Sequence, residues 1–447
     1  MTPSKPSTPP ASQSRPPVLR TISSPPLSPA SPLGSLKLDH LQQPSSLKIV
    51  TRLTPPTSPE LARPSINSDT SKGAEHPSKS LSCFLQKQGK PILCGDSLQE
   101  GNVPHIIECP FEVEVVRDSA NRPRVFGQGA WSKVYQAIVR RPNTVSSASS
   151  PRSILTPPPS PQTSVPLLVA VKTPLSNASR MVLRNEAITL SHLTSTPLHE
   201  NFIVAFHGYV SATSSLVLAP VPLSLSDHIS SRVRLARENH PQRDYTDPVL
   251  GHGGWLSLAG KTTIALAWLH DVGGVVHGDI KPGNILLLPS RSSDDFAFDP
   301  LLIDFSSSRI LSSTSPISNT LSALTREYTA PELLSPSVLR DPLAVAKTAS
   351  DVFSLAVTLI VAATGELTVY GGSVLRRQYM ATQGWRVLEF VKNGDGGMRV
   401  PSGGVVERVV EDAVRKVDDA RIHASRWRDL VRAIQKEEVP RQEMQDG

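Results

Sequence analysis

The sequence predicts an α+β protein with two lobes, preceded by a long tail that forms no core. Between residues 111 and 220, short β-branched and aromatic runs either alternate with polar residues or are continuously apolar, as strands do. Beyond residue 223 the spacing of apolar residues is mainly that of helices. A strand-rich part followed by a helix-rich part is typical of folds in which the two kinds of element are segregated.

Residues 1–104 form the tail, which is rich in Ser, Thr and Pro. The 447-residue chain holds 42 prolines and is 38% hydrophobic, an unusual balance for a fully globular protein. Because proline removes a backbone donor and apolar residues are sparse, burial cannot offset the entropy of ordering this segment, and we expect disorder. Its Ser/Thr-Pro pairs either resemble sites of proline-directed kinases or only reflect the composition. These pairs begin at Thr2, Thr8, Ser24, Ser28, Ser31, Thr54 and Ser58.

Charge and cysteine content narrow the class of protein. The net charge of +7 favours anionic partners, but no Lys/Arg block is dense enough to indicate specific nucleic-acid binding. The three cysteines Cys83, Cys94 and Cys109 lack metal-ligand spacing, so we expect a reducing intracellular compartment, cytoplasmic and/or nuclear. The N-terminus lacks the apolar core of a secretory signal, and "DVFSLAVTLIVAATG" is too short to span a membrane.

The strand-rich part divides into consecutive runs. The stretch "FEVEVVRDSANRPRVFGQGAWSKVYQAIV" alternates like paired strands with a turn at "NRP". Residues 141–165 return to the composition of the tail, which predicts a disordered insert before the apolar strand "PLLVAVKT". Residues 179–193 predict a helix, and the runs "FIVAFHGYV" and "SSLVLAPV" predict two further strands. The helix is expected to bury one face made of Met181, Val182, Ile188, Leu190 and Leu193.

The stretch "GQGAWSKV" contains two glycines, Gly127 and Gly129, which follow an apolar residue and precede a predicted strand. Glycine lets the backbone approach an anion closely, so this stretch fits a phosphate-binding loop. Taken alone, the stretch is a weak signal, and a hairpin turn that contains glycine is the better explanation. The dinucleotide-binding motif does not fit, because that motif requires a helix rather than a strand after the glycines.

Lys172 ends the apolar strand "VAVK", so it is either a surface residue or a buried charge with a partner. A buried ammonium requires a counter-charge. Glu186 lies on the core-facing side of the following predicted helix, and a Lys172–Glu186 ion pair would direct the ammonium toward phosphates.

Polar residues cluster in "HGDIKPGN", between two apolar runs. Asp279, Lys281 and Asn284 lie in this segment, and Asp304 follows the apolar run "PLLI" about twenty residues later. Carboxylate and amide oxygens are the ligands that Mg²⁺ prefers, and one carboxylate can instead accept a proton from a hydroxyl. A lone Asp after a strand is usually a turn or a cap, but four linked signals in this order favour a catalytic site.

These segments together resemble a eukaryotic-type protein kinase. The matching pieces are "GQGAWSKV", "VAVK", Glu186, "HGDIKPGN", "DFS", "TREYTAPE" and "SDVFSLAVTL". Lys281 and Thr325 are similar to the serine/threonine branch rather than to the tyrosine branch. The resemblance implies a two-lobed protein kinase-like fold over 105–435, with an N-lobe at 105–222 that includes the insert and a C-lobe at 223–435.

The resemblance also implies ATP and Mg²⁺ as cofactors, a protein Ser/Thr hydroxyl as acceptor, and a role for each matching residue. The residues implied around the nucleotide are Gly127, Gly129, Val134, Ala170, Lys172, Val221 and Leu286, with a hinge at 218–221. Those implied in catalysis are Asp279 as the base, Lys281, Lys172 and Glu186, and the magnesium ligands are Asn284 and Asp304. The resemblance also implies structural roles for Leu190, His277, Phe305, Thr325 and Glu332, and it implies that Asp351 is the acid that holds the backbone of the loop around Asp279.

Four positions depart from the family pattern. Ser132 replaces the third loop glycine, and Ser306 replaces the glycine that usually follows Asp-Phe. Pro220 in the hinge removes a backbone donor, so adenine bonding must use neighbours such as Val221. Gly278 stands where an arginine usually precedes the catalytic Asp.

Three functions are compatible with this sequence. The first is an active serine/threonine kinase, favoured because all five polar groups needed for the chemistry are present. The second is a pseudokinase or scaffold that binds nucleotide and uses the Ser/Pro-rich tail to bind partners. A small-molecule kinase of similar fold is the third and is disfavoured, because "TREYTAPE" resembles a peptide-binding segment.

Gly278 leads to the first prediction. An arginine at this position forms part of a positive cluster that a phosphate on the activation segment neutralises. Glycine carries no charge, so activity should not depend on phosphorylation of the serine-rich segment that follows Asp304. Replacing Ser312, Ser313, Thr314 and Ser315 by alanine should leave the rate of phosphate transfer nearly intact, and a collapse of that rate would refute the hypothesis.

Overall fold

The computed structural model describes residues 105–140, 167–239, 246–290, 296–312, 325–341 and 344–443. Several predictions fall outside these residues. They concern the tail 1–104 with its Ser/Thr-Pro pairs, the insert 141–165, Cys83, Cys94, Ser313, Thr314 and Ser315. Within the described residues, strands come first and helices dominate later, so the predicted two-lobed α+β fold is confirmed.

The described part of the N-lobe contains a six-stranded sheet in the order β1-β3-β4-β6-β5, with β2 paired to β3. Its strands are β1 (Glu112–Val115), β2 (Val125–Gln128), β3 (Ser132–Arg140), β4 (Leu168–Pro174), β5 (Phe206–Val210) and β6 (Ser215–Leu218). Every pairing is antiparallel. Strand β4 is central and buried on both faces, which explains why its sequence is continuously apolar rather than alternating.

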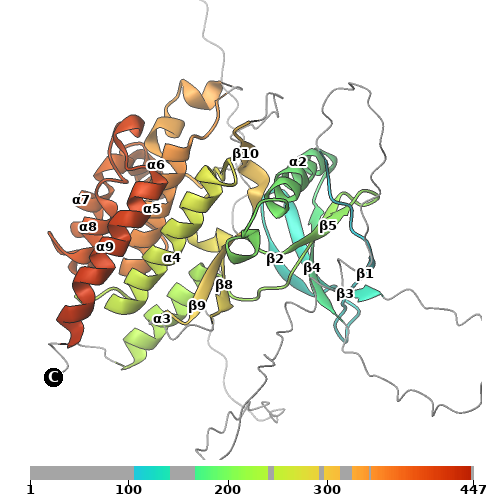
Figure 1. The fold of residues 1–447 in the computed structure, drawn as a ribbon, viewed down its shortest axis with the longest axis horizontal. Helices are drawn as coiled ribbons and strands as arrows, with labels where there is room; N and C mark the ends of the chain where they lie inside the picture. The colour runs from blue at the N-terminus through green and yellow to red at the C-terminus, as the bar shows by residue number, and fades with distance from the viewer. Residues whose placement is uncertain are drawn as a thin grey trace, which may run out of the picture. The chain divides into compact units, whose positions relative to one another are not determined.

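Helix α2 (Asn177–Thr194) packs beside this sheet (Figure 1). It begins at Ser176, whose hydroxyl accepts from the backbone N–H of Ser179 and so satisfies one of the free donors of the first turn. The buried face is centred on Leu183 and Leu190. The prediction was wrong for Met181, which is 59% exposed, because two helical positions separate it from Leu183 by about half a turn.

The C-lobe is built around helix α5 (Thr348–Thr364), whose residues from Ser350 to Thr364 are all buried. A helix that is apolar on every side has to be enclosed, and α4 (His252–Asp271) packs against it. Helix α9 (Ala424–Glu443) lies alongside α4 (Figure 1). The shorter helices are α3 (Leu225–Asn239), α6 (Val374–Ala381), α7 (Val387–Lys392) and α8 (Val405–Val410). Among the described residues, no helix is both long and apolar enough to cross a membrane.

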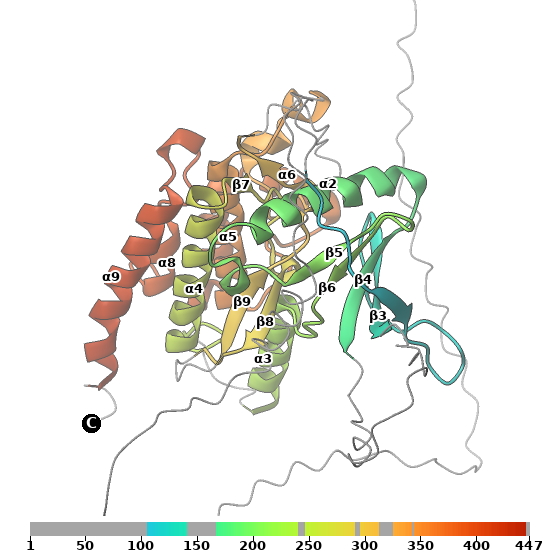
Figure 2. The same cartoon turned by 45° about the vertical axis from the view of Figure 1, so that its right-hand side comes forward.

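Four short strands lie between the sheet and the helices. Strand β8 (Ile285–Pro289) pairs with β9 (Phe298–Leu302), and β7 (Val275–Val276) pairs with β10 (Arg309–Ile310). Figure 2 shows β8 and β9 between the N-lobe sheet and α4. The segment between β7 and β8 and the segment after β9 therefore meet at the junction of the lobes, which brings Asp279 and Asp304 to one region.

Candidate active site

Lys172 lies in the middle of the N-lobe sheet and is only 5% exposed. Its Nζ atom lies 2.8 and 2.7 Å from the two carboxylate oxygens of Glu186 and 2.8 Å from Oδ1 of Asp304. Glu186 comes from helix α2, and Asp304 follows strand β9. Because a buried ammonium is stable only with counter-charges, this contact joins three separate elements of the fold.

The two carboxylates share one ammonium, and their pKa values shift in opposite directions. Burial alone would raise the pKa of Asp304, but Lys172 and the Ser306 hydroxyl outweigh it and hold that pKa well below its usual range. Burial raises the pKa of Glu186 to about 7, and repulsion from Asp304 adds to this effect while Lys172 opposes it. Asp304 is therefore the carboxylate that stays ionised at neutral pH.

The segment from His277 to Asn284 is anchored by Asp351, in the first turn of α5. The two oxygens of this carboxylate accept from the backbone N–H groups of His277, at 2.7 Å, and Gly278, at 2.8 Å. The Asp351 side chain is 1% exposed, and His270 Nε2 lies 3.0 Å from its Oδ2 atom. The sequence indicated Asp351 for this task, but gave no sign of His270, which lies on helix α4.

Gly278 has a conformational role as well as lacking charge. Its φ of +81° lies in the left-handed region that favours glycine. A Cβ atom at this position would lie 2.5 Å from the backbone oxygen of Ser307. The glycine therefore lets the segment from His277 to Asn284 approach the segment that follows Asp304.

Asp279, Lys281 and Asn284 form one hydrogen-bonded group. Lys281 Nζ lies 2.6 Å from Asp279 Oδ2 and donates to Thr325 Oγ1 at 2.7 Å. The Asn284 amide nitrogen donates to the backbone oxygen and the carboxylate of Asp279. Burial raises the pKa of Asp279, while Lys281 acts in the opposite direction. The carboxylate is thus held in place by a cation and an amide.

A cavity of about 340 Å³ lies between the hairpin of β2 and β3, which contains Gly127 and Gly129 (the glycine hairpin), and the end of the segment from His277 to Asn284. Its lining includes the predicted residues Gly127, Gly129, Val134, Ala170, Lys172, Glu186, Val221, Asn284, Leu286 and Asp304. Asp279 and Lys281 do not line the cavity, but both are hydrogen-bonded to Asn284, which does. Ser224 and Asp227 also line the cavity, although neither was among the predicted site residues. The Ser-x-x-Asp spacing before helix α3 was the available signal, since Ser224 Oγ accepts from Asp227 N.

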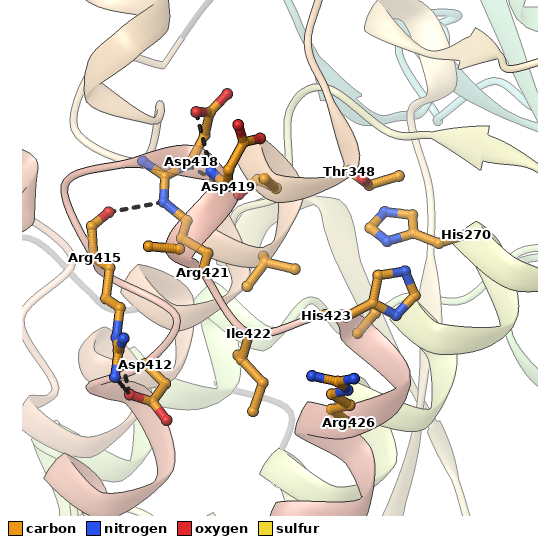
Figure 3. Close-up of a pocket in the computed structure, with 14 residues that line it drawn as sticks. His270, Thr348, Asp412, Arg415, Asp418, Asp419, Arg421, Ile422, His423 and Arg426 are labelled. Carbon is orange, nitrogen blue, oxygen red and sulfur yellow. Dashed lines mark hydrogen bonds and ion pairs between the residues drawn. The ribbon is translucent and has the colours of Figure 1, made fainter.

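A larger cavity of about 630 Å³ lies in the C-lobe and shares none of these lining residues (Figure 3). Several of its charged side chains are already paired. Arg415 contacts Asp412, and the fully buried Arg421 side chain binds Glu332 through two nitrogens. The Arg421–Glu332 pair holds the segment that contains Glu332 against the α8–α9 connection, and the Arg415–Asp412 pair lies within that connection. The groups suited to phosphoryl chemistry lie at the smaller cavity.

Comparison with known proteins agrees with this arrangement. The protein kinase domain family matches residues 168–397, just over half of the chain. Serine/threonine-protein kinase AfsK of Streptomyces griseus is 34% identical over 124 residues. This match covers 28% of the present chain and only 13% of that relative. The chain belongs to the protein kinase domain family.

The conformation of Gly278 leads to a prediction about stability. Gly278→Ala should lower the free energy of unfolding by about 3 kcal/mol, because both a positive φ and a backbone contact oppose the new methyl group. Gly274→Ala should cost only ~1 kcal/mol, since Gly274 has a φ of +60° but nothing within 4 Å of its Cβ position.

Gly283→Ala provides the matched control in the same loop, because its Cβ position is open and its φ is not positive. We expect a change of less than about 0.5 kcal/mol for this variant. Urea unfolding of all three proteins without nucleotide measures the differences. Equal costs at positions 274 and 278 would show that the contact with Ser307 does not matter.

Proposed function

We propose that this protein is an ATP-dependent serine/threonine protein kinase, with the N-lobe at 105–222 and the C-lobe at 223–435. The observation that carries the proposal is the contact of Lys172 with both Glu186 and Asp304 at the edge of a cavity. Phosphoryl transfer requires positioning and charge stabilisation more than covalent chemistry. A fixed ammonium, an ionised carboxylate and a second, raised-pKa carboxylate next to one cavity fit that requirement.

The cavity suits a nucleotide. Val134, Ala170 and Leu286 provide apolar surface for a purine ring. Within the hinge 218–221, Leu218 belongs to the paired strand β6, Ala219 N already donates to the backbone oxygen of Ala205, and Pro220 has no N–H. Val221 is therefore the residue of this hinge segment whose backbone N–H is left to bond the purine edge.

The glycine hairpin suits the phosphates. A Cβ at Gly127 would meet nothing within 4 Å, and one at Gly129 would meet only the Ser132 oxygen at 4.0 Å. Neither glycine has a positive φ. The packing of the protein therefore does not demand glycine at these positions, whereas close approach of a phosphate to the backbone does.

Asp304 and Asn284 fit a magnesium ion. Asp304 is ionised, and because the Asn284 amide nitrogen donates to Asp279, its carbonyl oxygen is left for a cation. Mg²⁺ usually takes one or two such protein ligands together with phosphate oxygens and water. When bound, the ion neutralises charge on the phosphates.

Asp279 is then the general base. Its carboxylate accepts the proton of a substrate Ser or Thr hydroxyl as the hydroxyl oxygen bonds to the γ-phosphorus. The bond between that phosphorus and the β–γ bridging oxygen breaks, and ADP leaves. Lys281 contacts Asp279, and its role is to stabilise charge on the transferred phosphoryl group, while Lys172 holds the α- and β-phosphates.

A scaffold that binds nucleotide without transferring phosphate is the alternative. Ser306 and Pro220 favour it, because each changes a segment that active family members use. Both changes are accommodated locally, since Ser306 bonds to Asp304 and Val221 retains its N–H. We propose protein hydroxyls as acceptors and an intracellular, cytoplasmic and/or nuclear location; the proline-directed kinases predicted for the tail remain a hypothesis.

Loss of the base and loss of the phosphate anchor should differ in their effects. Asp279→Asn should lower phosphate transfer to a generic basic protein at least 100-fold, with nucleotide binding retained. Lys172→Met should lower transfer by a similar factor and also weaken nucleotide binding. The measurements are transfer of label from ATP with Mg²⁺ and binding of a fluorescent ATP analogue.

Three outcomes would speak against the proposal. Wild-type protein that binds nucleotide but transfers no more label than Asp279→Asn would support the scaffold. Absence of nucleotide binding would contradict both functions. Unchanged activity of Lys172→Met would refute its role as the phosphate anchor.

The hinge assignment has its own test. Val221→Pro removes the backbone donor and should weaken nucleotide binding about 10-fold, while Val221→Ala keeps the N–H and should bind nearly as wild type. Circular dichroism checks that both variants are folded. Equal affinities of the two variants would show that the Val221 N–H does not contact the nucleotide.

A further inference from the structure

A pair of buried hydroxyls joins helix α2 to the segment that follows Asp304. Ser308 Oγ lies 3.0 Å from Thr189 Oγ1 and 2.6 Å from the backbone oxygen of Phe305. Thr189 is 3% exposed and Ser308 is 5% exposed. Ser308 Oγ is the donor in both contacts, so its hydroxyl proton is shared between Thr189 Oγ1 and the backbone oxygen of Phe305.

This pair lies next to the proposed catalytic groups. Thr189 is three residues after Glu186, so both side chains lie on the same face of the helix. Glu186 Oε1 also accepts from the backbone N–H of Phe305 at 3.2 Å. Helix α2 is thus tied to residues 304–308 at two places one turn apart, which opposes both sliding and rotation of the helix.

The hydroxyls are not needed to fill space. The neighbouring buried face of α2 is formed by apolar residues such as Leu183, Ala187 and Leu190. A buried hydroxyl is costly unless it is hydrogen-bonded, whereas an apolar side chain of the same shape would pack without this requirement. The pair therefore makes one arrangement of the helix and the segment more favourable than neighbouring arrangements.

We propose that Thr189 and Ser308 are positioning residues that hold Glu186 and Asp304 in the arrangement required for phosphoryl transfer. This inference rests on the proposed function. It provides a physical reason for a chain with Gly278 to hold an active arrangement, because hydroxyls already in the fold make the connection between helix and segment.

The kinetic consequence follows from a shift in population. The ATP phosphates can contact Lys172 and the Asp304 site together only when helix α2 and residues 304–308 are held in this arrangement. If that arrangement becomes rarer, the KM for ATP rises, and saturating ATP restores most of kcat. A purely structural role would instead reduce the amount of folded enzyme, which lowers kcat and leaves the KM unchanged.

The experiment compares Thr189→Val with Thr189→Ser in the full chain. Thr189→Val keeps the shape but removes the hydroxyl, and should raise the KM for ATP about five-fold with little change in kcat. Thr189→Ser keeps the hydroxyl and should resemble wild type. Ser308→Ala should raise the KM at least as much, and the Thr189→Val/Ser308→Ala double variant should resemble Ser308→Ala rather than show the product of both effects.

Thr194→Val is the matched control, because Thr194 is on the same helix but donates to Leu190 within it. Hydrogen exchange of peptides covering 184–190 and 303–310, without nucleotide, gives a readout that does not depend on catalysis. Exchange in both peptides should be faster in Thr189→Val and unchanged in Thr194→Val.

Wild-type exchange and wild-type KM in Thr189→Val would overturn the inference, as would an equal effect of Thr194→Val. Wild-type protein without phosphate transfer would refute the proposed function instead. In that case the exchange measurement still decides whether the two hydroxyls hold helix α2 to the segment.

Discussion

The buried ammonium of Lys172 is the constraint on which the remaining geometry depends. Glu186 is 14 residues away in the chain and Asp304 is 132 residues away, yet both contact the same nitrogen. Removing either carboxylate would leave the buried ammonium with less compensating charge. The loss of folding free energy would be larger than that from removing one partner of an ion pair on the surface. The central strand, helix α2 and the end of β9 therefore have to occupy fixed relative positions.

Asp351 fixes the position of the segment from His277 to Asn284 in a similar way. Its buried carboxylate accepts from two consecutive backbone N–H groups, so the loop can leave strand β7 without burying free donors. Asp304 follows an apolar strand and Asp351 lies in the first turn of an apolar helix, yet the two carboxylates have different functions. One faces a cavity beside a cation, and the other is enclosed and bonded to backbone.

The departures from the family pattern have local physical explanations. Gly278 provides a positive φ and room for the backbone of Ser307. Ser306 forms a bond to Asp304 that a glycine could not form. Ser132, in place of the third loop glycine, is buried where strand β3 begins. None of these positions removes a group that the proposed reaction requires.

The sequence alone determined the order of strands and helices and the identity of the polar groups, because both follow from local periodicity and short motifs. It identified Lys172, Glu186, Asp279, Asn284 and Asp304 before any contact was known. Only the tertiary structure decided that Met181 faces solvent, that Arg421 pairs with Glu332 and that Thr189 meets Ser308. Such contacts depend on helix rotation and on residues far apart in the chain, which local patterns do not specify.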